Sequence, residues 1–173
     1  MSAKETLRSV RLLIVVLLLL GTATGKTIYV DDSAGGADDG TSWADAYVYL
    51  QDALYEAESG DEIRIAQGTY WPDLGGGNMP GNQHAKFQLM NGAELYGGFP
   101  SGGTWNERDP DTYESILSGD IGTPGDASDN SYHVVAASAC ADGTILNGFV
   151  ITGGNASQAP KNRGGGIYIV DSG

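Results

Sequence analysis

Short runs of β-branched and aromatic residues, separated by turns rich in glycine and asparagine, recur from residue 26 to the end of the chain. The segment Asp61–Ala66 alternates polar and apolar positions and places Ile63 and Ile65 on one face, as in a half-buried strand. The pattern predicts a mostly β protein. The other expected strands are Lys26–Val30, Gly68–Pro72, Lys86–Met90, Ala93–Phe99, Ser115–Ser118, Tyr132–Ala136, Thr144–Leu146, Phe149–Thr152 and Ile167–Val170.

The turn Asn147-Gly148 separates two of these strands, and an Asn-Gly pair between strands favours a hairpin. However, Glu94–Phe99 matches Thr144–Phe149 position for position in residue type. Both segments are polar, apolar, apolar, turn residue, glycine and phenylalanine. A recurring unit of this kind favours stacked coils that share one core over an isolated hairpin.

One segment has the apolar spacing of a helix. Ser42 is placed to cap it, and Asp45 lies in its first turn, where a carboxylate suits the helix dipole. We expect the helix to end at Ser59-Gly60 and to cover the open first coil of a stack. The apolar stripe expected to face the core is Trp43, Ala46, Tyr47, Leu50, Ala53, Leu54 and Ala57.

The glycine-punctuated strands of Gly143–Asn155 and Gly164–Val170 resemble the repeats of secreted right-handed parallel β-helix proteins, the pectin-lyase-like fold. The runs Asp39–Trp43, Leu50–Leu54 and Gly60–Ile63 are similar to the opening module of bacterial secreted β-helix proteins. The resemblance covers most of the chain after residue 26. It implies a right-handed parallel β-helix, a solenoid that begins with a capping α-helix.

The first 25 residues have the three parts of a secretory signal peptide. Basic side chains come first, the apolar run Leu12–Leu20 follows, and small residues precede Lys26. An uncleaved membrane anchor is the alternative, but the run is shorter than the roughly 20 residues that span a bilayer. We therefore expect a secreted or cell-surface protein.

The sequence thus divides into a signal peptide (1–25), a strand with an acidic loop and the capping helix (26–60), and the coils of the β-helix (61–173). The chain stops just after Ile167–Val170, and no polar cap follows. An open terminal coil exposes unpaired strand edges. We therefore expect the β-helix to be truncated at its C-terminal side, and its end to be covered by missing coils or by an oligomer.

Net charge narrows the choice of partners. The chain carries a formal charge of −13, and the part after residue 25 holds six basic and 21 acidic side chains. Such a surface repels nucleic acids and anionic membranes. It also repels anionic polysaccharides unless calcium bridges the two.

The loop Gly119–Asn130 is the best candidate for a metal site. Asp120, Asp126 and Asp129 offer the hard oxygen ligands that calcium prefers. The loop lacks the spacing of an EF-hand. The alternative is a turn-rich loop whose aspartates bond their own backbone.

Aromatic residues in loops are candidates for stacking on sugar rings. Trp105, in an open loop, suits carbohydrate binding as well as it suits packing. Trp71, beside Pro72 at a strand end, favours packing. A second acidic cluster favours solvated loop charge, although paired carboxylates hydrolyse glycosidic bonds in some enzymes. Its members are Asp31, Asp32, Asp38 and Asp39.

No catalytic signature can be assigned to residues of this chain. We therefore expect a non-catalytic exported module whose loops attach to carbohydrate or to a cell surface. The alternative is a polysaccharide lyase or glycoside hydrolase of the pectin-lyase-like fold, with its active site in later coils. The fold accommodates both functions, so a choice between them requires the geometry of a site.

Overall fold

The computed structural model describes residues 25–138, 142–157 and 163–170, so the expected signal peptide lies outside the described residues except for Gly25. The described part consists of short strands, one α-helix and one 3-10 helix. In chain order they are β1 (Thr27–Val30), α1 (Leu50–Glu56), β2 (Glu62–Ala66), β3 (Gly68–Tyr70), β4 (Phe87–Gln88), β5 (Glu94–Phe99), η1 (Trp105–Glu107), β6 (Ser115–Ser118), β7 (Val135–Ser138), β8 (Ile145–Asn147), β9 (Phe149–Thr152) and β10 (Ile167–Val170).

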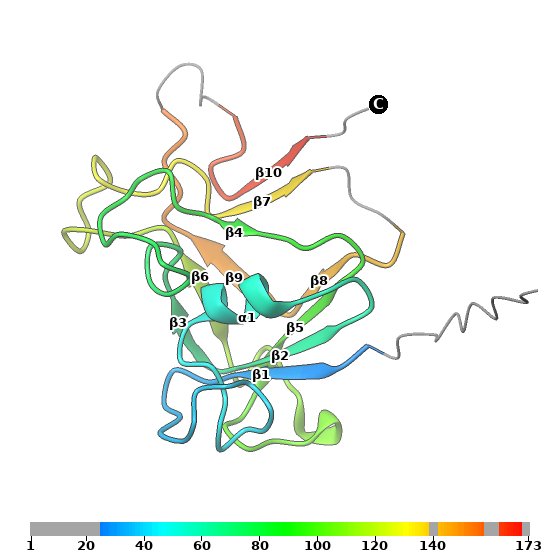
Figure 1. The fold of residues 1–173 in the computed structure, drawn as a ribbon. Helices are drawn as coiled ribbons and strands as arrows, with labels where there is room; N and C mark the ends of the chain where they lie inside the picture. The colour runs from blue at the N-terminus through cyan, green and yellow to red at the C-terminus, as the bar shows by residue number, and fades with distance from the viewer. Residues whose placement is uncertain (1–24, 139–141, 158–162, 171–173) are drawn as a thin grey trace, which may run out of the picture.

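The strands form three parallel sheets, which makes the protein mostly β, as the sequence predicts. The first sheet has the order β1-β2-β5-β8, the second β3-β6-β9 and the third β4-β7-β10. From β2 onward the chain visits the first, second and third sheet in that order three times. Figure 1 shows this for the third sheet, where β4, β7 and β10 lie one above another.

The turn at Asn147-Gly148 is a corner between two sheets and not a hairpin, because β8 pairs with β5 whereas β9 pairs with β6. Gly148 has φ +80°, a conformation that glycine adopts without steric cost. The repeat seen in the sequence is offset by one residue. Leu95 pairs with Leu146 rather than Ile145, and an irregularity between β2 and β5 accommodates the extra residue of β5.

Apolar side chains of the first sheet stack in register inside the molecule. Ile28 pairs with Ile63, Ile63 with Leu95, and Leu95 with Leu146. The first three are buried, and Leu146 packs against the same cluster. The other two sheets and α1 complete this core with further buried residues, which include Leu50, Ala53, Tyr70, Phe87, Leu117, Val134 and Val135.

The helix is shorter than the sequence predicts, because α1 begins at Leu50 and not near Ser42. Ser42 instead accepts a hydrogen bond from the backbone N–H of Asp45 in a turn. The backbone of Tyr47 bonds to both Tyr29 and Asp31. The segment before α1 therefore supplies partners to the exposed edge of β1, and this requires an extended backbone. No helix in the described ranges is long and apolar enough to cross a membrane.

The last strands are the least buried of the described part. Exposed apolar side chains lie on β9 and β10, at Val150, Ile167, Ile169 and Val170. The expected cover over this end, by further coils or by an oligomer, stays a prediction.

The stacked core predicts a large difference between two substitutions of similar size. Leu95→Ala removes a fully buried side chain and should lower the free energy of unfolding by about 2–5 kcal/mol. Met79→Ala removes a side chain that is 75% exposed and should change it by no more than about 0.5 kcal/mol. Urea denaturation measures both, and equal losses would contradict the core described here.

Candidate functional site

The three candidate calcium ligands all bond to the backbone of their own loop. Asp120, Asp126 and Asp129 each accept a hydrogen bond from a backbone N–H between residues 123 and 128. The side chain and backbone of Ser128 lower the pKa of Asp126. Across the described ranges, no three His, Cys, Asp or Glu side chains are grouped to hold a metal ion. Calcium binding by this loop stays a prediction.

Trp105 lies in η1 and is 44% exposed, but its ring has several partners within the chain. The ring of Tyr96 contacts it edge-on at 4.9 Å between centroids, and the ring of Phe99 lies at 5.5 Å. The guanidinium carbons of Arg64 and Arg108 lie 5.2 Å and 5.7 Å from its centroid. These contacts fix Trp105 on the outer side of the first sheet.

The loop that carries Trp105 is attached to the first sheet at several points. The indole N–H of Trp43 donates to the carbonyl of Gly103 at 2.8 Å. The hydroxyl of Ser101 donates to the buried carboxylate of Asp31. This loop is therefore a fixed cover over the sheet. Carbohydrate binding by Trp105 stays a prediction, and much of its ring already serves packing.

Trp71 occupies a more open position. It follows β3, where Tyr70 is buried and the alternation of the strand directs the next side chain outward. Its side chain is 37% exposed and lines two clefts that adjoin each other. Leu74 is the other residue common to both.

The larger of these, here called the Asp120 cleft, has a volume of about 510 Å³ and lies between the loops at residues 71–81 and 120–124. Asp73 and Asp120 supply its carboxylates, and Ile121 and Pro80 are among its apolar residues. Asp73 is buried and accepts a hydrogen bond from the backbone N–H of Gly81 at 2.8 Å. One wall therefore carries an aromatic ring and another carries positioned acceptors.

The smaller one, here called the Asp32 cleft, has a volume of about 250 Å³. Asp32 is its only charged residue, and Tyr49 and Trp71 are its exposed aromatic ones. Partial burial raises the pKa of Asp32, and the nearby charge of Asp31 raises it further. Burial, and then the charge of Asp32, raise the pKa of Tyr70 as well.

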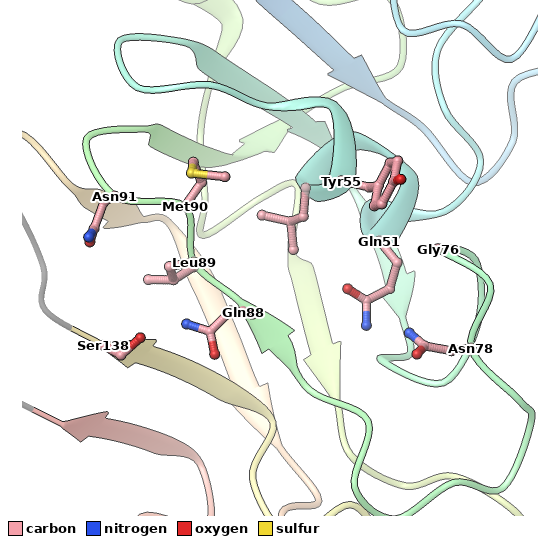
Figure 2. Close-up of a pocket in the computed structure, with 10 residues that line it drawn as sticks. Gln51, Tyr55, Gly76, Asn78, Gln88, Leu89, Met90, Asn91 and Ser138 are labelled. Atoms are coloured by element: carbon pink, nitrogen blue, oxygen red, sulfur yellow. The ribbon is translucent and has the colours of Figure 1, made fainter.

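A further cleft of about 400 Å³ lies beside α1. In Figure 2 it is surrounded by residues of α1, of the chain around and after β4, and of the loop at Gly76 and Asn78. Gln51 and Tyr55 line it from α1, and Gln51 already donates to the carbonyl groups of Pro72 and Lys86. None of its lining residues is charged, so it offers no acid or base near neutral pH.

No protein-family model, curated protein or solved structure matches this chain.

The sequence predicts a site residue at Asp120 but not at the other residues that the structure places in the two clefts. The sequence favours packing for Trp71, which stands beside a proline, and solvated loop charge for Asp32. Asp73 was not singled out. The alternation of Thr69, Tyr70 and Trp71 was the available signal, since an inward Tyr70 directs Trp71 outward.

The turn that carries Trp105 should make the stability of the folded state depend on pH. The N–H and hydroxyl of Thr104 both donate to the carboxylate of Glu107, and these bonds lower its pKa. Because the pKa of Glu107 is lower in the folded state than in the unfolded state, these bonds stabilise the folded state fully above the unfolded-state pKa. This stabilisation is lost as the pH falls through the folded-state pKa. An NMR titration should place the pKa of Glu107 below its ordinary value of 4.5.

The matched variant for this titration is Thr104→Val, which removes the hydroxyl donor and keeps the N–H. It should raise the pKa of Glu107 toward its ordinary value. An unchanged pKa in this variant would contradict the capping arrangement.

Proposed function

We propose that the chain is an exported, right-handed parallel β-helix that binds carbohydrate without acidic groups in the Asp120 cleft, with α1 as its N-terminal cap. The repeated order in which strands visit three parallel sheets supports this architecture. Connections between parallel strands are right-handed in about 98% of cases. The cap is supported by the position of α1, which buries Leu50 and Ala53 beside β1 and β4.

The single observation that carries the binding function is the exposed ring of Trp71 in a cleft with two carboxylates. Aromatic faces pack against the C–H faces of sugar rings, while carboxylates accept hydrogen bonds from sugar hydroxyl groups. A volume of about 510 Å³ is within the usual range for small-ligand sites. The backbone bonds of Asp73 and Asp120 hold both acceptors in place.

The negative charge of the chain and of the Asp120 cleft disfavours acidic sugars. The chain carries a formal charge of −13, and Asp73 and Asp120 add negative charge to the cleft itself. A uronic acid or a sulfated sugar would therefore be repelled. Glycans without acidic groups, on a cell surface or in an extracellular matrix, suit this site best.

Glycoside hydrolysis is the second candidate function, because Asp73 and Asp120 line one cleft and two carboxylates are the usual catalytic groups of glycosidases. Binding is better supported, since both carboxylates are already engaged by their own loops. Incubation with labelled oligosaccharides, followed by chromatography, separates the two candidates. Shortened products that disappear in the Asp120→Asn variant would establish hydrolysis.

Replacing Trp71 should abolish most of the binding. Isothermal titration calorimetry with hexamers of β-1,4-linked glucose, mannose and xylose should detect at least one ligand. Trp71→Ala should weaken that binding at least tenfold, about 1.4 kcal/mol or more. Trp105→Ala is the matched control and should leave the affinity within about twofold, since its ring packs on the first sheet.

If Trp105→Ala loses binding and Trp71→Ala keeps it, the binding site lies at the first sheet and the proposal is wrong about its place. Binding that survives both substitutions would contradict an aromatic carbohydrate site. Circular dichroism of each variant confirms that the fold is retained.

Export predicts a defined mature N-terminus. Expression of the full chain in a host with a general secretion pathway should yield a soluble product that starts at Lys26, as measured by intact-mass spectrometry. Recovery of the uncleaved chain in the membrane fraction would instead support the anchor alternative.

A further inference from the structure

We propose that the glycan bound beside Trp71 contains amino sugars, and that the Asp32 cleft holds the protonated amino group of a sugar next to the one in the Asp120 cleft. This inference rests on the proposed carbohydrate function and deepens it by naming the substrate class. It is carried by the shared wall between the clefts, by the position of the Asp32 carboxylate and by its aromatic surroundings.

The two clefts share lining residues. Trp71 and Leu74 line both of them, so an oligosaccharide that packs on Trp71 reaches from one into the other. The Asp32 cleft, at about 250 Å³, is the smaller. A single adjacent sugar unit suits it better than a long segment.

The carboxylate of Asp32 is fixed against β3. A Cβ atom at Gly68 would lie only 2.6 Å from Oδ2 of Asp32, so the absence of a side chain there permits this close approach. The backbone of Thr69 also bonds to the carboxylate. The charge is therefore held beside β3, in the lining of the Asp32 cleft.

Asp32 has no basic partner in the part of the chain that the structure describes. The ion pair there joins Arg64 to Glu62, and the charge that acts on Asp32 is the like charge of Asp31. A cationic ligand would relieve this repulsion and form a charge-assisted hydrogen bond.

The remaining walls suit an ammonium group on a sugar. Tyr49, which is 42% exposed, and Trp71 present aromatic rings to the Asp32 cleft. Aromatic faces attract cations, and they also pack against sugar C–H groups. The aliphatic side chains of Val48 and Leu50 complete the lining. A neutral hydroxyl would use the carboxylate only, whereas a protonated amine uses the carboxylate and the rings.

The test compares three hexamers by isothermal titration calorimetry: β-1,4-linked glucosamine, N-acetylglucosamine and glucose. The pH is set where the glucosamine amines are protonated. The wild-type protein should bind the glucosamine hexamer at least tenfold more tightly than the other two. Asp32→Asn should remove most of this preference, because it weakens the binding of the glucosamine hexamer more than that of the glucose hexamer.

Asp142→Asn is the matched control, because it removes the same charge from an exposed turn before β8. It should keep the preference. Tyr49→Ala should reduce the preference at least threefold through the loss of an aromatic wall, which keeps the inference testable if Asp32→Asn proves unstable.

The outcomes separate the two proposals. If none of these hexamers binds, and the mannose and xylose hexamers do not bind either, the carbohydrate function fails, and this inference fails with it. If glucose binds but glucosamine is not preferred, or if the preference survives Asp32→Asn, the amino-sugar inference alone is wrong. A parallel experiment titrates calcium chloride into the wild-type protein and into Asp32→Asn. If calcium binds the wild-type protein and not the variant, Asp32 is a metal ligand and the inference is wrong.

Discussion

The register of the parallel strands is the constraint on which the rest of the molecule depends. Each strand can bury its apolar face only if its inward residues lie on those of its neighbour, as Ile63, Leu95 and Leu146 do. A shift of one residue would move every side chain to the opposite face. The same register fixes which side chains point outward. It therefore sets the chemistry of the surface as well as that of the core.

Outward-facing side chains have different surroundings on the first and second sheets. On the first sheet, the loop of Trp105 covers the surface, and cation–π and aromatic contacts hold it there. On the second sheet, Trp71 extends from the end of β3 between loops that leave space on both sides. The two tryptophans thus differ in their surroundings, because one loop packs back on its sheet and the other loops form the walls of clefts.

Much of the fold could be predicted from the sequence, because alternation and turn residues are local signals. Ser115–Ser118 and Ile167–Val170 coincide with β6 and β10. The early helix start at Ser42 was wrong, since the edge of β1 requires backbone partners that only tertiary structure reveals. The offset of Leu95 against Leu146 depends on an irregularity between strands. Clefts between loops that are far apart in the sequence, such as the cleft of Asp73 and Asp120, could not be predicted because no local sequence pattern indicates them.

The central claim is that carbohydrate binds at Trp71. The chain has three tryptophans, so their indole N–H signals in a two-dimensional NMR spectrum report on three separate places. Addition of a glucosamine hexamer should shift the signal of Trp71 and leave those of Trp43 and Trp105 in place, because Trp43 bonds to Gly103 and Trp105 packs on the first sheet. A shift of the Trp105 signal with an unchanged Trp71 signal would contradict the account.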